Sequence, residues 1–311
     1  MKEFWKRRGF TLAFSCLLIL FTGYALLDTF VIPRRYSSAE PMTAQEAAGE
    51  ASSSGAIDAE LSLHIAEEAA ADENSYVDDH ISVTVTELRE YDTAIYVADV
   101  TLSAPEYLKT ALACDTYGKN VKAAASEISA GVGAILAVNG DFYGARSDGY
   151  VIRNGVLYRA EGSGNEDLVI YADGSFAIID EDAISAEALL AKGAQQVLSF
   201  GPALVEDGEI AVSRTEEVGK AMASNPRTAI GIIGENHYVL VVSDGRTSES
   251  EGLSLYELAE VMQRLGVQTA YNLDGGGSST MVFRGEVVNN PTTGGKTVKE
   301  RSVSDIVYVG Y

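Results

Sequence analysis

Cysteine is almost absent from this sequence, because only two of its 311 residues are cysteines. Cys16 lies in an apolar N-terminal run, and Cys114 is alone in the rest of the chain. The remainder of the chain therefore has no internal disulfide and no CxxC pair that could ligate a metal. This excludes an animal ectodomain held together by disulfides and leaves a bacterial surface protein open.

Histidine is also scarce, with three residues in the chain. His64 and His80 lie in or beside a polar spacer, and His237 lies in an expected hairpin turn. A Ser-His-Asp triad built on Ser278 or Ser279 would need His237 close by, which this placement disfavours. A zinc site would lack soft ligands. Carboxylates, amides and arginines remain as the groups that could carry chemistry.

Positive charge is the third shortage. The chain has 23 Lys and Arg residues against 45 Asp and Glu residues, which gives a formal net charge of -22. Nucleic acid is excluded as an expected partner, because binding it depends on basic side chains that neutralise phosphates. An excess of acid repels acidic polymers in general unless a local basic site exists.

A long apolar run extends from Gly9 to Leu27 without a charged residue. Four basic residues precede it and two follow it: Lys2, Lys6, Arg7, Arg8, Arg34 and Arg35. A helix needs about 20 apolar residues to cross a bilayer, so residues 1–36 are expected to form a single-pass transmembrane signal anchor. The basic bias predicts a cytoplasmic N-terminus, with the rest of the chain outside the cytoplasm. A cleaved secretory signal is the alternative.

Two further segments follow the expected anchor. Residues 37–75 contain no Lys or Arg and are rich in Ala, Ser and Glu, which predicts an acidic spacer. Helical spacing from Ile57 to Ala71 predicts a short helix within this spacer. From Tyr76 onward, short apolar runs alternate with turns, so we expect residues 76–311 to form one domain.

Tight-turn signals divide this domain into strands. Asn154-Gly155 stands between YVIR and VLYR, and this dipeptide is a strong signal for a two-residue β-hairpin. Comparable turns are expected at Asp173-Gly174, Asp207-Gly208 and Arg284-Gly285. So many tight turns predict largely antiparallel pairing.

Helices are expected to be fewer than strands. Ser254 and Glu257 form a capping-box pattern ahead of a helix that should end before Gly266. Ser185 is expected to begin another helix, and residues 119–129 have helical composition. Pro105 suits the first turn of a helix that would continue to residue 113. Strands with interspersed helices indicate an α+β fold.

Polar residues follow the apolar runs at three places, and two of these resemble ordinary turns. The first run leads into Asn139 and Asp141, and a second pair of runs carries Arg227 at its start and Asp244 and Arg246 at its end. Asn, Asp and Gly tolerate the dihedral angles of turns, so a turn alone would explain each of these two clusters.

The third polar cluster is less easily explained as a turn. Its run leads through Asn272 and Asp274 into Gly275, Gly276, Gly277 and Ser278. Consecutive glycines cost chain entropy on folding, and they allow backbone N–H groups to approach an anion. The segment is neither a Walker motif nor a dinucleotide fingerprint.

These clusters resemble, in order, the phosphodiester glycosidase family. The resemblance rests on AVNGDFYG, VIRNGVLY, SFGPALV, NPRTAIGI, SDGR and YNLDGGGSSTMV, and it covers residues 83–311. It implies a compact α+β domain with a curved sheet and hydrolysis of a sugar-1-phosphodiester at the glycosidic C–O bond. It also implies that the active site contains Asn139, Asp141, Arg227, Asp244, Asp274 and the glycines from Gly275.

The expected roles follow from the chemistry of this reaction. Glycosidases usually use two carboxylates, so Asp141 and Asp274 are the first catalytic candidates and Asp244 the third. Arg227 is expected to hold the phosphate with its planar guanidinium, and Arg246 and Arg301 are weaker candidates. The expected substrate-binding residues are Asn139, Arg227, Asn272, Gly275, Gly276, Gly277, Ser278 and Arg246.

Two other functions fit the same residues. A metal-dependent phosphodiesterase could bind Mg²⁺ or Ca²⁺ with Asp141, Asp244 and Asp274, although no cofactor is required by the sequence. A non-catalytic module could bind glycans during assembly of the cell envelope or an exopolysaccharide. For each reading the expected partner is a phosphorylated glycan, together with the membrane at the N-terminus.

Overall fold

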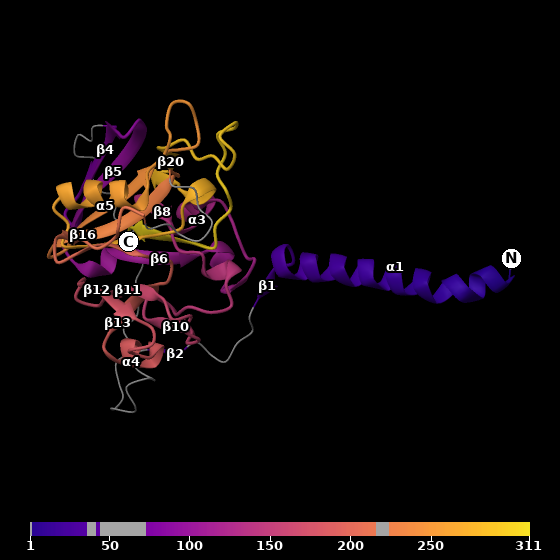
Figure 1. Ribbon diagram of the computed structural model, residues 1–311. Helices are drawn as coiled ribbons and strands as arrows, with labels where there is room; N and C mark the ends of the chain where they lie inside the picture. Colours follow the sequence, from indigo (N-terminus) through magenta and orange to yellow (C-terminus); the bar gives the residue numbers. More distant parts are fainter. Residues whose placement is uncertain (1, 36–41, 44–72, 216–223) are drawn as a thin grey trace.

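The computed structural model describes residues 2–35, 42–43, 73–215 and 224–311. The short helix expected from Ile57 to Ala71, which contains His64, lies outside the described residues. The described chain consists mainly of β-strands, with few helices (Figure 1).

The N-terminal helix α1 (Lys2–Phe30) extends away from the folded domain (Figure 1). Its large apolar side chains are exposed where they are described, over residues 13–29. β1 (Arg34–Arg35) then pairs with β7 (Gly118–Lys119), and the Asn120 Nδ2 donates to the carbonyl oxygens of Thr29 and Ile32 at 3.2 and 3.3 Å. A transmembrane helix was expected here, but the described part of the chain contains no helix that is long and apolar enough to cross a membrane.

The largest sheet has eight strands, and every neighbouring pair in it is antiparallel. In spatial order the strands are β15 (Glu209–Ile210), β14 (Ala203–Glu206), β18 (Thr269–Asn272), β16 (Arg227–Gly234), β17 (His237–Ser243), β5 (Thr93–Leu102), β4 (Ile81–Glu90) and β3 (Ser75–Val77). Helix α5 (Leu255–Arg264) covers one face, where Leu258 and Met262 pack against the sheet.

A five-stranded sheet shares the main hydrophobic core with the eight-stranded sheet. Its order is β20 (Glu286–Val287), β19 (Met281–Phe283), β8 (Leu136–Asn139), β21 (Asp305–Val309) and β6 (Leu108–Leu112). Helix α3 (Ala125–Val132) packs against this sheet, and its Ile128 lies in one hydrophobic cluster with Ile306 of β21. The two sheets thus lie between helices α5 and α3.

A six-stranded sheet completes the domain and has its own helix, α4 (Ala186–Ala191). Its order is β12 (Phe176–Asp180), β11 (Glu166–Tyr171), β13 (Ala194–Leu198), β9 (Val151–Arg153), β10 (Val156–Arg159) and β2 (Met42–Thr43). Short 3-10 turns occur at η1 (Pro105–Tyr107), η2 (Ala113–Asp115), η3 (Tyr143–Ala145) and η4 (Gly276–Ser278).

The expected hairpins and the main helix are confirmed. Asn154 and Gly155 adopt φ angles of 50° and 74° between β9 and β10, and a two-residue type I′ turn requires positive φ at both positions. Ser254 and Glu257 form the expected capping box, in which Glu257 N donates to Ser254 Oγ at 3.2 Å and Ser254 N donates to Glu257 Oε2 at 2.8 Å.

Three expectations differ from the structure. The helix predicted from Pro105 stops after one 3-10 turn, because the following residues pair with β21 as strand β6. The helix predicted over residues 119–129 begins only at Ala125. The strands are divided among separate sheets and do not form one curved sheet.

Candidate active site

Asn139 joins the chain segments that build the candidate site. It ends β8, and its side chain is fully buried. Its Nδ2 donates to the carbonyl oxygen of Asp274 at 2.6 Å, and its Oδ1 accepts from Thr228 Oγ1 at 2.8 Å and from Thr280 N at 3.2 Å. One amide therefore fixes the end of β8 against β16 and against both sides of the glycine loop. This contact set makes Asn139 a positioning residue.

Asp274 is the half-buried carboxyl group of the site. It lies two residues after the end of β18, and Ser278 and the backbone N–H of Gly275 donate hydrogen bonds to it. Burial nevertheless raises the pKa of Asp274 above its usual value, against the lowering effect of Ser278 and Arg301, and the negative charge of Asp141 adds to the increase. A carboxyl group with a raised pKa is a candidate for proton transfer in a catalytic site.

Two arginines lie against the glycine loop beside Asp274. A Cβ atom on Gly276, whose φ is 62°, would lie 2.8 Å from Arg246 Nη2. A Cβ atom on Gly277 would lie 2.8 Å from Arg301 Nη2 and 2.4 Å from Thr293 Oγ1. Only glycine lets both guanidinium groups approach the loop so closely. Burial and the charge of Arg301 lower the pKa of Arg246, so the two positive charges are near each other.

Arg227 and Asn272 lie beneath this loop. Arg227 is 3% exposed, and its Nε donates to the carbonyl oxygen of Leu253 at 2.9 Å. A Cβ atom on Gly275 would lie 3.9 Å from Arg227 Cδ. Asn272 is also buried and donates through Nδ2 to the carbonyl oxygen of Gly201 at 2.7 Å. The structure therefore places Arg246 and Arg301 against the glycine loop and Arg227 next to Gly275, and the expected role of Arg227 in phosphate binding stays a prediction.

Asp141 belongs to a buried ion-pair network. Its Oδ1 accepts from Tyr143 N at 3.0 Å, and its Oδ2 accepts from Arg153 Nη2 at 2.8 Å and from Ser199 N at 2.9 Å. Arg153 Nε donates to Asp305 Oδ2 at 2.9 Å. The three charged side chains are at most 2% exposed. Asp141 is thus enclosed by donors, whereas Asp274 is partly accessible.

Asp305 shares Arg153 with Asp141, so two carboxyl groups face one guanidinium. Burial raises the pKa of Asp305 to about 8; Arg153 opposes this increase, and the charge of Asp141 adds to it. Its Oδ1 has no hydrogen-bond partner among the described residues. A Cβ atom on Gly140 would lie 2.4 Å from that oxygen, so the glycine makes room for the carboxyl group.

Asp244 is held by the segment that follows β20. Its Oδ1 accepts from Asn290 N at 2.8 Å and from Asn289 Nδ2 at 3.2 Å, and its Oδ2 accepts from Asn290 Nδ2 at 3.0 Å. Tyr96 donates a longer bond of 3.4 Å. Because both oxygens are occupied, the contacts of Asp244 are those of a residue that anchors a loop.

The three aspartates of the metal-dependent alternative do not gather around a common point. Asp141 faces Arg153, and Asp244 faces Asn289 and Asn290. Among the residues that the structure describes, no group of three or more His, Cys, Asp or Glu side chains could hold a metal ion. This arrangement gives no support to the Mg²⁺ or Ca²⁺ site proposed from the sequence.

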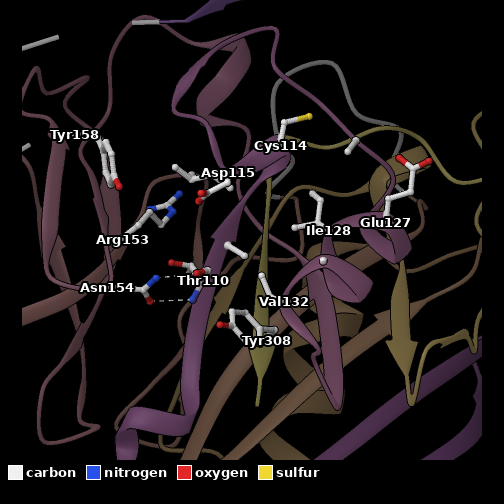
Figure 2. Close-up of a pocket in the computed structure, with 14 residues that line it drawn as sticks. Thr110, Cys114, Asp115, Glu127, Ile128, Val132, Arg153, Asn154, Tyr158 and Tyr308 are labelled. Carbon is white, nitrogen blue, oxygen red and sulfur yellow. Dashed lines mark hydrogen bonds between the residues drawn. The ribbon is translucent and has the colours of Figure 1, made fainter. Parts of the chain in front are cut away.

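A separate pocket of about 720 Å³ has Arg153 among its lining residues (Figure 2). It lies between the β9–β10 hairpin and α3, and Tyr158, Asp115 and Ile128 line it. Asp274 and the glycine loop are not among its lining residues. We place the candidate active site at the glycine loop, because the partly accessible carboxyl group and the paired arginines are there.

A largely antiparallel fold that gathers a desolvated carboxyl group and two arginines around a glycine loop has the groups that a hydrolase of anionic esters uses. The sequence pattern of the phosphodiester glycosidase family matches residues 132–310. The chain therefore belongs to the phosphodiester glycosidase family.

Individual relatives agree with this assignment. The prophage-derived protein YomE of Bacillus subtilis is 31% identical over 57% of this chain and 28% of its own length. The N-acetylglucosamine-1-phosphodiester alpha-N-acetylglucosaminidase of Mus musculus is 28% identical over 55% of this chain and 36% of its own length. The chain thus spans well under half of these relatives.

Solved structures confirm the fold. The catalytic domain of the zebrafish N-acetylglucosamine-1-phosphodiester alpha-N-acetylglucosaminidase, auto-inhibited by its pro-peptide, matches with a TM-score of 0.59 and 21% identity, over 74% of this chain and 83% of that one. A hypothetical protein from Synechocystis matches with a TM-score of 0.56 and 16% identity, over 74% of this chain and 62% of that one. At these identities the likeness concerns the fold alone.

Proposed function

We propose that this protein hydrolyses a sugar-1-phosphodiester at the glycosidic C–O bond. The observation that carries the proposal is the meeting of Asp274, Arg246 and Arg301 at one glycine loop. The arginines are suited to hold the phosphate, because guanidinium groups form strong charge-assisted hydrogen bonds to phosphate oxygens. Asp274 lies beside them, where the anomeric carbon of a bound substrate would be.

The charges fit the course of this reaction. Water adds to the anomeric carbon, the glycosidic C–O bond breaks, and its electron pair leaves with the phosphate oxygen. The leaving phosphate gains negative charge as the bond breaks, since a phosphate monoester has a second pKa of about 6. Positive groups placed where charge develops stabilise the transition state. Asp274, with its raised pKa, is the group suited to transfer a proton to or from the reacting oxygen atoms.

Hydrolysis in water labelled with oxygen-18 tests which bond is broken. Nucleotide sugars and synthetic glycosyl phosphodiesters serve as the substrate panel. We expect the label in the released sugar, because the attack occurs at carbon. Label in the phosphate would show P–O cleavage and would contradict the proposal, as would tight binding of these substrates without turnover.

We further propose that the catalytic domain acts outside the cytoplasm, next to the cell membrane. The support is the basic cluster ahead of the apolar run from Gly9 to Leu27 and the exposure of the apolar side chains described in α1. We expect protease added to intact cells to digest the region after Ser37. Protection in intact cells together with digestion after lysis would show that the domain is cytoplasmic.

A further inference from the structure

Basic side chains gather at one edge of this acidic protein. Arg246, Lys296, Lys299 and Arg301 make no ion pair among the described residues. Cations without an ion pair also occur elsewhere in the described chain, as at Lys109 and Lys192, but here four of them lie on or beside one loop at the glycine-loop site. With a net charge of -22 on the whole chain, such a local region of positive charge indicates an anionic partner.

The two lysines belong to the loop that follows β20, residues 291–300, which we call the basic loop. Arg246 Nη1 donates to the carbonyl oxygen of Thr293 at 2.7 Å, so the basic loop lies directly beside the glycine-loop site. Thr292 Oγ1 donates to the carbonyl oxygen of Thr297 at 2.9 Å and accepts from Gly295 N at 3.0 Å, which makes the loop compact. Lys296 and Lys299 are exposed on it.

The acidic residue of the basic loop makes no ion pair with the lysines. Glu300 accepts hydrogen bonds from the backbone N and the hydroxyl of Ser126, at 3.0 and 2.5 Å, and is thereby directed toward α3. The ends of the basic loop are fixed as well, because Lys299 N donates to the carbonyl oxygen of Pro291 at 2.8 Å. The lysines are therefore presented by an ordered loop whose carboxylate is engaged elsewhere.

The number of cations exceeds what one phosphodiester needs. A single phosphodiester carries one negative charge, and Arg246 and Arg301 already lie at the glycine loop. We propose that the substrate is a polymer of phosphodiester-linked units, and that Lys296 and Lys299 bind the phosphate next to the one that is cleaved. This inference rests on the proposed hydrolase function and specifies the substrate class of the same site.

A sugar-1-phosphate polymer fits this edge better than nucleic acid does. Binding of single-stranded nucleic acid uses aromatic side chains on which bases stack. The basic loop and the glycine loop, residues 291–300 and 275–280, contain no aromatic residue. The edge therefore offers charge for a phosphate backbone without a surface for bases.

Calorimetric binding to the full chain carrying Asp274→Asn, which is expected to slow turnover strongly, tests the proposal. The probes are a synthetic sugar-1-phosphodiester, with one phosphodiester, and the next longer oligomer of the same sugar-phosphate repeat, with two. We expect the second phosphodiester to lower the Kd about tenfold at low salt and less at high salt, because the added contact is electrostatic. In the Lys296→Gln/Lys299→Gln variant the ratio of the two Kd values should approach one. The control, Lys109→Gln/Lys192→Gln, removes two charges elsewhere and should keep the wild-type ratio.

Three results would overturn this inference. In the first, the two oligomers bind with equal Kd to the chain with intact lysines. In the second, the lower Kd of the longer oligomer persists without Lys296 and Lys299. In the third, an oligothymidylate with two phosphates binds as tightly as the longer oligomer, with the same dependence on the lysines. Failure of the proposed hydrolase function would appear separately, as the absence of sugar release from every phosphodiester by the chain with Asp274 intact.

Discussion

Replacing Asp274 by Asn is expected to lower kcat/KM on a sugar phosphodiester by about 10²-fold to 10⁴-fold, the usual contribution of a general acid or base. Asn has nearly the same shape and can still accept hydrogen bonds from Ser278 and Gly275, so the loop should stay in place. It cannot carry or release the proton. The fold should remain intact, with an unchanged unfolding midpoint in urea.

The pH profile of the wild type shows which proton transfer Asp274 performs. Burial raises its pKa, so the group stays protonated to a higher pH than an ordinary Asp. If Asp274 acts as an acid, the rate decreases as the pH rises through this pKa; if it acts as a base or nucleophile, the rate increases. The change of rate with pH that Asp274 causes, whether a decrease or an increase, should be absent from the Asp274→Asn variant. Asp173→Asn, in an exposed turn, is the control, and a near wild-type rate for Asp274→Asn would contradict the assignment.

Replacing Arg153 by Leu is expected to destabilise the folded protein by about 3–5 kcal/mol, because it leaves two buried carboxyl groups without their shared cation. Arg153 is 2% exposed and contacts both Asp141 and Asp305. Arg264→Leu is the matched control, since its pair with Glu90 is largely exposed and such pairs contribute about 0–1 kcal/mol. Urea unfolding measures both variants, and similar losses would show that the buried network does not support the fold.

The same network predicts a dependence of stability on pH. The pKa of Asp305 is raised to about 8 in the folded protein, while the unfolded chain has the ordinary value of about 3.9. Between these values the folded state binds more protons, so this group's contribution to stability decreases as the pH rises toward 8. Asp305→Asn should remove that decrease. The urea midpoint of the wild type should therefore fall between pH 5.5 and pH 8.5, and the midpoint of Asp305→Asn should fall less over the same interval.

The elements that the sequence predicts well depend on neighbouring residues. Asn154-Gly155 forms its hairpin because the turn is encoded by two adjacent residues, and Ser254 with Glu257 begins its helix for the same reason. Pro105 carries an equally local helix signal, yet the residues after it form β6. Pairing with β21, contributed by residues 305–309, outweighs helix propensity there.

The sequence predicts which residue types form the candidate site, but not which of these residues contact one another. The glycine loop and Asp274 stand out in the sequence because they are contiguous. Arg153 and Asp305 were not predicted, since each is one charged residue at the end of an apolar strand and their pairing joins β9 to β21. The only sequence signal is a charge next to an otherwise apolar run. Long-range pairing also determines that Asp141 is enclosed while Asp274 remains accessible.

The position of β21 has a consequence for the way the protein folds. This strand lies between β8 and β6, which both precede it by most of the length of the domain. During synthesis, β8 and β6 therefore have unpaired edges until β21 has left the ribosome, and unpaired edges promote aggregation. Arg301, four residues ahead of β21, joins the site in the same step. Resistance to aggregation and enzymatic competence should thus be acquired together, late in the folding of the chain.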